Sequence, residues 1–384
     1  MTDGRSLMTV PTLLTYCEGR VEETVAAIET LVRLESPSTD KAAVDRCGET
    51  LMRLLRELGA DVDALPQTGR GNHVRARIAG RGAPLLILGH IDTVWSIGTL
   101  ARMPIRRDGD RLYGPGAFDM KAGVAIALTA VAALRATNTP HHPITMLWTT
   151  DEEIGSGTSR PIIESEARNA EAVFVLEPAL GTDGALKTAR KGCGRFDIIV
   201  EGIAAHAGVD PSKGVSAIHE LATQIAAVES LQDLSRGVSV NVGLVSGGSR
   251  ANVVAEHARA VVDVRAATPA QAMAVEQAIR SLQPARRGTR LTIQGGFERP
   301  PMERSPGTAR LFERARGIAA SFGRELHEGA TGGGSDGNFT AALGVPTLDG
   351  LGAVGDGAHA AHEHIEVGAL AWRCALTAAL LAAE

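Results

Sequence analysis

The sequence predicts an α/β protein in which a small second domain is inserted into a larger one. Three observations support this expectation. Strand-like and helix-like segments alternate from residue 73 to residue 176, as in a sheet flanked by helices. Residues 195–294 then follow the order βαββαβ, which is that of a ferredoxin-like sandwich. The chain of 384 residues is also longer than one ordinary hydrophobic core requires.

The first part of the chain contains the elements of the larger domain. Apolar residues at helical spacing predict helices over 21–33 and 41–58, and the turn at 36–39 separates them. Short apolar runs with branched side chains predict the strands, and longer periodic segments predict the helices that alternate with them. The strands are expected at 73–78, 84–88, 144–150 and 172–176, and the helices at 120–136 and 160–167.

The second part begins near residue 191, where the pattern changes. Strands are expected at 195–201, 238–245, 258–266 and 290–294, and helices at 214–230 and 269–282. The proline-rich segment 297–306 is predicted to be the return linker, and helices resume at 307–323 and 368–383. We therefore expect a discontinuous domain made of residues 1–190 and 299–384, with an inserted domain at 191–298.

Composition and charge exclude several classes of function. A net charge of −5 and an aromatic content of 3% argue against a nucleic-acid partner. Four cysteines without a CxxC pair indicate reduced thiols in a reducing compartment. The first 20 residues lack the pattern of a secretory signal, and no apolar run is expected to be long enough to cross a membrane. A cytoplasmic protein with no membrane partner is expected.

Acids and histidines stand directly after the predicted strands or in glycine-rich turns. They are His90, Asp92, Asp119, Glu152, Glu153, Glu177 and His359. A single histidine at a strand end is more often structural than a ligand. Several strand ends of one sheet that each deliver a histidine or a carboxylate point instead to a site beyond the carboxyl ends of the strands. Mixed imidazole and carboxylate ligands suit a divalent metal ion, and zinc is common in hydrolases.

Five motifs in this order give the chain a resemblance to a known family. They are GHIDTV at 89–94, GPGAFDMK at 114–121, TDEEIGS at 150–156, LEP at 176–178, and GAH at 357–359 with Glu363. Together they resemble the zinc aminoacylase/carboxypeptidase family of metallopeptidases, and within it the glutamate carboxypeptidase branch. The resemblance implies a zinc-exopeptidase-like catalytic domain, with a mixed sheet flanked by helices, and an inserted ferredoxin-like dimerisation domain.

The same resemblance implies a site for two Zn²⁺ ions per subunit, and these ligands would also suit Mn²⁺ or Co²⁺. The implied ligands are His90 and Glu177 for one ion, Glu153 and His359 for the other, and Asp119 as the bridge between them. Asp92 would hold the ring of His90 in the correct tautomer. Glu152 would be the general base. His362 and His364, beside the last ligand, are expected to be surface residues.

The inserted domain carries a second implied set of residues. His206 would reach across a homodimer interface and donate a hydrogen bond to the oxyanion that develops in the other subunit's active site. Asn252 and Arg265 resemble the family's contacts to a substrate carboxylate, which a guanidinium binds with two parallel bonds. Gly333 and Gly334 resemble a loop whose backbone approaches the same carboxylate.

These residues predict a metal-dependent hydrolase that cleaves an amide bond next to a free carboxylate. The expected substrates are small N-acyl amino acids or peptides, from which glutamate or a similar amino acid is released. Two alternatives remain open: a deacylase or desuccinylase of the same family, and a catalytically silent binding protein with the same fold. The silent protein would be expected to lack Glu152 or a ligand, and every one of these positions is intact.

Overall fold

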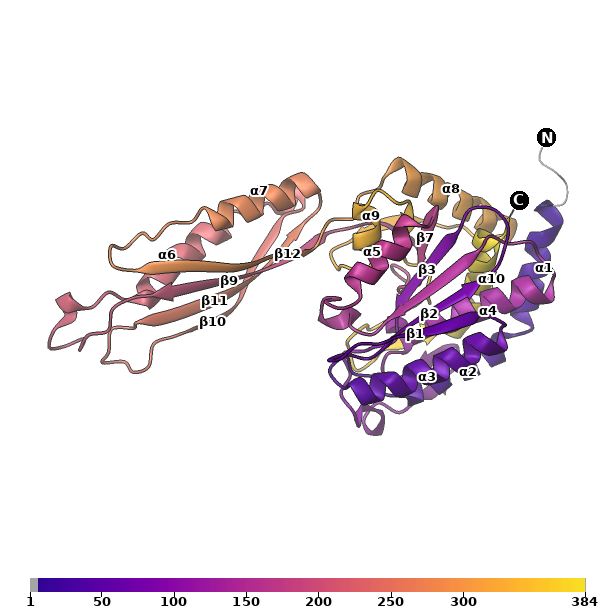
Figure 1. Cartoon of the computed structure of the whole chain (residues 1–384), viewed down its shortest axis with the longest axis horizontal. Coiled ribbons are helices and arrows are strands. Elements are labelled where there is room, and N and C mark those ends of the chain that lie inside the picture. Colours follow the sequence, from indigo (N-terminus) through magenta and orange to yellow (C-terminus); the bar gives the residue numbers. More distant parts are fainter. Residues whose placement is uncertain (1–5, 384) are drawn as a thin grey trace. The chain divides into compact units, whose positions relative to one another are not determined.

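The computed structural model describes residues 6–383, which form two compact units (Figure 1). The first unit contains the chain up to Ala189, the segment Arg304–Thr331 and the chain from Ser335 onward. The second unit contains Arg190–Glu303 and the short segment Gly332–Gly334. Each unit has its own hydrophobic core.

The first unit is built on a mixed sheet of six strands. In spatial order these are β1 (Asp61–Leu65), β2 (His73–Ile78), β6 (Ile144–Thr149), β3 (Leu85–His90), β7 (Ala172–Val175) and β14 (Thr347–Leu348). The strands β6, β3 and β7 are parallel neighbours, whereas β2 pairs antiparallel with β6. All six residues of β3 are buried, as expected for a central strand covered on both faces. The predicted α/β class with a mixed sheet is confirmed.

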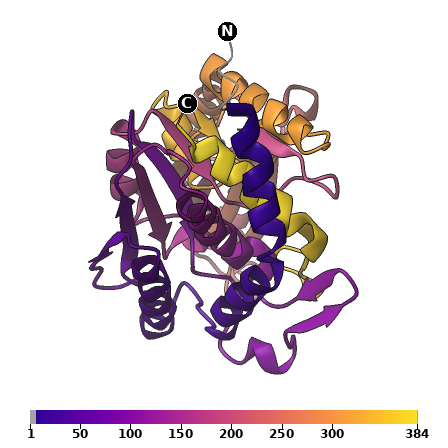
Figure 2. The same cartoon turned by 90° about the vertical axis from the view of Figure 1, so that its right-hand side faces the viewer.

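Helices cover both faces of this sheet. Alternate residues of each strand point to opposite faces, so one strand contributes side chains to two cores. Leu85 and Ile87 belong to one core with the larger group of helices, and Leu86 and Leu88 belong to another with the smaller group. The larger group is α1 (Ser6–Glu18), α2 (Val21–Arg33), α3 (Lys41–Glu57), α4 (Ala122–Ala136), α8 (Pro306–Ser321) and α10 (Leu370–Leu381). The smaller group is α5 (Arg160–Arg168) and α9 (Gly337–Ala342). In Figure 2, α1 runs alongside the C-terminal helix α10.

Helix α4 corrects one expectation from the sequence. Together with the turn before it, Ala117–Ala136, it is long and apolar enough to pass a test of length and composition for a membrane span. It lies in the core, however, and 83% of its apolar stretch is buried inside the protein. A helix that packs on nearly all sides is apolar on nearly all sides, so its burial accounts for its composition.

A small second sheet in the first unit supports two loops that matter for the site. Its strands, in order, are β15 (Gly355–Asp356), β16 (His364–Glu366), β5 (Arg111–Tyr113) and β4 (Arg106–Asp108). Asp119 lies in the loop after β5, and His359 lies in the turn between β15 and β16. A further two-stranded pair joins β8 (Leu186–Arg190) to β13 (Glu328–Thr331).

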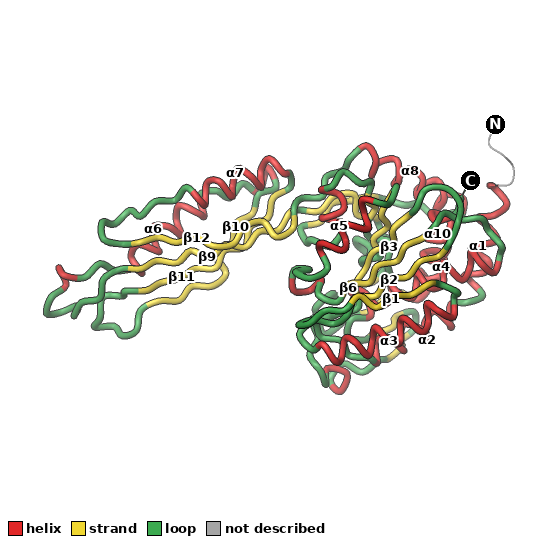
Figure 3. Tube along the Cα trace, viewed as in Figure 1, coloured by secondary structure: helices red, strands yellow, loops and turns green. Residues whose placement is uncertain are grey.

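The second unit is a four-stranded antiparallel sheet with two helices (Figure 3). The strands, in order, are β10 (Ser239–Gly247), β11 (His257–Ala266), β9 (Gly192–Glu201) and β12 (Arg290–Arg299), and the helices are α6 (Ala217–Glu229) and α7 (Pro269–Arg280). Phe196, Ile198 and Val200 of β9 share one core with both helices. Strand β12 continues to Arg299, beyond the predicted end at residue 294, because it keeps pairing with β9 through a register shift at Phe297.

Candidate metal centre

Three neighbouring parallel strands deliver polar side chains to one edge of the first unit's sheet. His90 is the last residue of β3. Glu152 and Glu153 form the short turn that follows β6, and Glu177 comes two residues after β7. Because the carboxyl ends of adjacent parallel strands meet at the same edge, these side chains come together there. The predicted positions at the strand ends thus converge in space.

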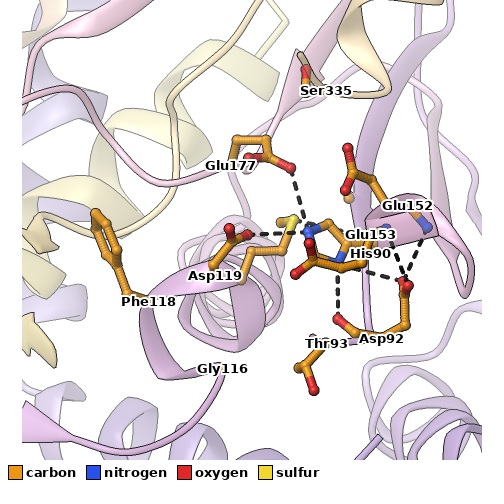
Figure 4. A network of polar contacts seen from close by, with 12 residues as sticks. His90, Asp92, Thr93, Gly116, Phe118, Asp119, Glu152, Glu153, Glu177 and Ser335 are labelled. Carbon is orange, nitrogen blue, oxygen red and sulfur yellow. Dashed lines mark hydrogen bonds and ion pairs between the residues drawn. The ribbon is translucent and has the colours of Figure 1, made fainter. Parts of the chain in front are cut away.

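Asp119 reaches this edge from a distorted turn rather than from a helix. The sequence predicted a helix from residue 120, but Asp119 and Met120 have non-helical backbone angles, and α4 begins only at Ala122. The turn starts at Gly116, whose φ is 73°, and a Cβ atom on Gly116 would lie 2.6 Å from Thr93 Cγ2. Only glycine fits this close approach without strain. The turn thereby projects the carboxylate of Asp119 toward His90 (Figure 4).

The Asp119 carboxylate offers one oxygen to each of two histidines. Its Oδ1 is 3.2 Å from His90 Nε2, and its Oδ2 is 3.4 Å from His359 Nε2. Glu177 Oε1 lies 3.4 Å from His90 Nε2, and Glu153 Oε2 lies 3.1 Å from His359 Nε2. Each imidazole therefore faces two carboxylates, and Asp119 is common to both groups. His359 has a φ of 62°, and a non-glycine residue in this region is uncommon and often functional.

Asp92 ties the first histidine to the turn of the two glutamates. The Nδ1 atom of His90 is 2.9 Å from the main-chain oxygen of Asp92 and 3.5 Å from its Oδ1. With Nδ1–H donating there, Nε2 presents its lone pair to Asp119 and Glu177. The Asp92 carboxylate also accepts the main-chain N–H groups of Glu152 and Glu153, each at 3.3 Å (Figure 4).

The donor set fits divalent metal ions. Two groups of potential ligand atoms, each lying within 4.8 Å of one another, are present among the described residues: His90 with Asp119 and Glu153, and His90 with Glu152 and Glu177. Imidazole nitrogen with carboxylate oxygen is a combination that Zn²⁺ and its relatives accept. Because Glu152 belongs to the second group, it is close enough to bind a metal ion as well as to act as the predicted base.

The electrostatics of the cluster favour added positive charge. Hydrogen bonds to Asp119 and Glu153 raise the pKa of His359 to about 10. Burial alone would lower the pKa of His90, but hydrogen bonds to Asp119, Asp92 and Glu177 raise it well above its usual value. Burial raises the pKa of Glu153, as expected where carboxylates crowd together in a low dielectric. Metal cations would supply the charge that this arrangement attracts.

The remaining predicted site residues belong to the second unit. His206, Asn252, Arg265, Gly333 and Gly334 all lie there. His206 is exposed, and its Nδ1 accepts hydrogen bonds from the main-chain N–H groups of residues 208 and 209, each at 3.1 Å. Its Nε2 is therefore the ring atom that can donate. Asn252 is exposed, and its main-chain oxygen accepts a bond from the N–H of residue 207 at 3.0 Å.

Arg265 already has protein partners. Its Nε and Nη2 each donate to the carboxylate of Asp263 at 2.8 Å, and its Nη1 lies 2.6 Å from Cys193 Sγ. These bonds use three of the five N–H groups of a guanidinium. Asp263 thus fixes the position of the Arg265 guanidinium. One N–H group remains on Nη1 and one on Nη2, and these are its outer N–H groups. The carbonyl oxygens of Gly333 and Gly334 accept bonds from Arg190, both at 3.1 Å.

Two features of the site were not foreseen. Ser38 donates to Asp92 Oδ2 at 2.6 Å across 54 residues of sequence, and no local pattern could indicate this partner. Glu363 belongs to a recognised motif, but the sequence suggested no role for it, and its side chain is buried beneath the Asp119 loop.

The expectation that His362 and His364 are surface residues is wrong for one of them. The side chain of His362 is 65% exposed. His364 is only 6% exposed, because it lies on β16 and its ring packs against Tyr113 of the paired strand at 5.1 Å between centroids.

The sequence of this chain is similar to a known protein family and to individual known enzymes. The family model described as "Peptidase family M20/M25/M40" matches residues 86–383. Carboxypeptidase G2 from Pseudomonas sp. (strain RS-16) is 30% identical over 367 residues, which cover 93% of this chain and 88% of that protein. Succinyl-diaminopimelate desuccinylase from Delftia acidovorans is 27% identical over 90% of this chain and 94% of its own length.

Solved structures share the fold. Aminopeptidase PepT from Bacillus cereus superposes with a TM-score of 0.76 over 94% of this chain and 98% of that chain, at 24% identity. At this identity the match establishes the architecture, including the presence of both units, and leaves the choice of substrate open.

Proposed function

The chain belongs to peptidase family M20/M25/M40, and we propose that it hydrolyses an amide bond next to a free carboxylate in small N-acyl amino acids or peptides. The amino acid released is glutamate or a close analogue. The observation that carries this proposal is the arrangement at Asp119, whose two oxygens face two different histidines at 3.2 and 3.4 Å. A shared carboxylate of this kind suits a pair of metal ions in a hydrolase. Similarity to carboxypeptidase G2 along 93% of the chain supports the choice of substrate class.

We assign the metal ligands by these contacts. The proposed ligands are His90 and Glu177 for one ion, Glu153 and His359 for the other, and Asp119 for both. Zn²⁺ is the proposed metal, and Mn²⁺ or Co²⁺ would suit the same atoms. Such ions, when bound, would supply Lewis-acid chemistry: they would lower the pKa of a bound water and polarise the substrate carbonyl.

The protein's own groups then move protons and hold the substrate. Glu152 accepts the proton of the attacking water and passes it to the leaving amine. His206, through Nε2–H, donates a hydrogen bond to the oxygen on which negative charge develops. The outer N–H groups of Arg265, with Asn252 and the backbone at Gly333 and Gly334, bind the substrate carboxylate. Asp263 holds the guanidinium in position for this contact.

A second candidate function is deacylation or desuccinylation of an N-acyl amino acid. It is favoured by the desuccinylase that matches 90% of this chain. Both candidates use the same site and differ in the acyl group and in the amino acid that carries the free carboxylate. The proposed location is the cytoplasm, which is supported by four free cysteines, Cys17, Cys47, Cys193 and Cys374.

A substrate panel tests the proposal directly. Purified protein with added Zn²⁺ is assayed on N-acyl-glutamates, N-acyl-aspartates, N-acyl-ornithines, N-succinyl-diaminopimelate and dipeptides, with Glu152→Ala as the control. The highest kcat/KM is expected on the glutamate conjugates, and the control is expected to be inactive on all of them. A clear preference for the ornithine or succinyl substrates would favour the second candidate. Turnover of no panel member would favour the silent binding protein.

We also propose that the chain forms a homodimer through the second unit and that His206 serves the partner's active site. Glu152→Ala and His206→Ala should each be nearly inactive alone, the latter by about 10²- to 10³-fold. In a mixed dimer, one site would combine an intact Glu152 with an intact His206 from the other chain. Co-expression with two different affinity tags should therefore restore about half of the wild-type activity per dimer.

Failure to restore activity would contradict the crossed arrangement. If His206 served its own chain, each site of the mixed dimer would lack one of the two groups. A protein that sediments as a monomer at assay concentration would contradict the dimer itself.

A further inference from the structure

The buried carboxylate of Glu363 receives four N–H donors. Its Oε2 accepts from Trp95 Nε1 and from the main-chain N–H of Gly116, both at 2.8 Å. Its Oε1 accepts from the main-chain N–H of Phe118 at 2.9 Å and from that of Asp119 at 3.0 Å. Glu363 is 1% exposed. Each oxygen thus satisfies two N–H donors, and three of the four donors are main-chain groups of the Asp119 loop that would otherwise lose their bonds to water.

The main chain of Glu363 fixes the turn that carries His359. The Glu363 N–H donates to Ala360 O at 3.0 Å, and the Ala360 N–H donates to Gly357 O at 2.8 Å, which closes the turn around His359. The carbonyl oxygen of Glu363 accepts from Gly114 N at 3.3 Å, at the start of the Asp119 loop. One residue therefore holds both loops and, through Trp95, the segment that follows β3.

These hydrogen bonds hold the loops of Asp119 and His359, the two proposed ligands that do not come from the central sheet. His90 ends β3 and Glu177 follows β7, and hydrogen bonds within the sheet fix the positions of both strands. Asp119 and His359 lie on loops that are 240 residues apart in sequence, and Glu363 is a hydrogen-bonded link between them. A metal site tolerates displacements of only about 0.5 Å, so this link bears directly on how Asp119 and His359 face each other.

We propose that Glu363 is a positioning residue that holds the Asp119 loop and the His359 turn in register and so forms the second metal position, between Asp119, Glu153 and His359. This inference rests on the proposed two-metal function. It predicts a selective effect: loss of the Glu363 carboxylate weakens the ion held by His359 much more than the ion held by His90 and Glu177. A residue that only stabilised the fold would not discriminate between the two positions.

The variants are chosen to separate these roles. In Glu363→Gln an NH₂ group replaces one oxygen, so two of the four N–H donors face another donor instead of an acceptor. The matched control is Glu366→Gln, three residues further on in β16. The side chain of Glu366 is 29% exposed and accepts from Arg111 at 3.1 Å. Trp95→Phe is the milder variant, because it removes only one of the four donors.

The experiment is a calorimetric titration of each metal-free protein with Co²⁺, followed in parallel by the visible absorption of bound Co²⁺. Wild type and Glu366→Gln are expected to bind two ions with the same pair of affinities. In Glu363→Gln the first ion should change by less than about threefold, and the second should weaken by about 10- to 100-fold. If Glu363→Gln does not fold, Trp95→Phe should still weaken the second ion by about fivefold.

Three results would overturn the proposal. One is a Glu363→Gln protein, or a Trp95→Phe protein in its place, with unchanged stepwise affinities and only a lower Tm, which would make Glu363 purely structural. Another is equal weakening of both ions. A wild-type chain that binds only one ion would overturn the two-metal function and this inference together, whereas two ions in wild type and unchanged affinities in the variant would remove only the positioning role.

Discussion

Asp119→Ala is expected to lose both metal ions and to reduce kcat/KM by about 10³-fold or more. The reason is geometric: Asp119 has one oxygen close to each of the two histidines, at 3.2 and 3.4 Å. Without it each ion loses a ligand, and the repulsion between the two cations is no longer offset. Metal catalysis contributes several kcal/mol to hydrolysis, and each 1.4 kcal/mol is a factor of ten in rate. Elemental analysis of the gel-filtered variant measures the ions, and initial rates give kcat/KM.

Two other aspartates provide the comparison for Asp119→Ala. Asp108→Ala removes a 75% exposed side chain from β4 of the same small sheet and should behave as wild type. Asp92→Ala should retain both ions but bind them about 10- to 100-fold more weakly. The main-chain oxygen of Asp92 still holds His90, while the bonds to the turn of Glu152 and Glu153 are lost. An Asp119→Ala protein with two tightly bound ions would contradict the bridging assignment.

Glu152→Gln is expected to keep both ions and to lower kcat by about 10²- to 10⁴-fold, which is the usual contribution of a general base. Glutamine has the size of glutamate but cannot accept the proton of the attacking water. The turn should remain in place, because the main-chain N–H of Glu152 bonds to Asp92 Oδ1 at 3.3 Å and does not depend on the side chain. The metal content and the single-turnover rate are measured on the same sample.

The metal content of Glu152→Gln decides between two roles for this residue. Glu152 lies within 4.8 Å of the ligand atoms of His90 and Glu177. If Glu152→Gln lost one ion and its hydrolysis rate fell in the same proportion, Glu152 would be a metal ligand rather than the base. Glu164→Gln is the matched control, since Glu164 lies on α5 and pairs with Arg160 at 2.8 Å near the surface. It should leave both the metal content and the rate unchanged.

The central elements of the fold were predictable because their patterns are local. Strand β3 is a continuous apolar run, and α2 has apolar residues at helical spacing, so both were placed within two residues of their ends. Strand β1 was missed because its five residues, DVDAL, include two aspartates, which are depleted in strands. The end of β12 was missed because its pairing with β9 is a tertiary contact that overrides the glycines and prolines around Phe297.

The site was predictable to the extent that its residues follow strands. His90, Glu153 and Glu177 each stand just after an apolar run, which is a signal in the sequence itself. The contacts that orient them are not local: Ser38 bonds to Asp92 across 54 residues, and Glu363 bonds to the N–H of Asp119 across 244. Hydrogen bonds between residues so far apart leave no local pattern in a single sequence. His364 was misjudged for the same reason, since its burial depends on β5, which is far away in the chain.

We propose that two metal ions bound in the first unit carry out the hydrolysis. The most direct test of this proposal is a titration of the metal-free wild-type protein with Zn²⁺, in which bound metal and the hydrolysis of an N-acyl-glutamate are measured at each point. We expect no hydrolysis without metal, binding that saturates at two ions per chain, and activity that reaches its maximum when the second ion is bound. Saturation at about one ion per chain or fewer, or full hydrolysis by the metal-free protein, would contradict this proposal.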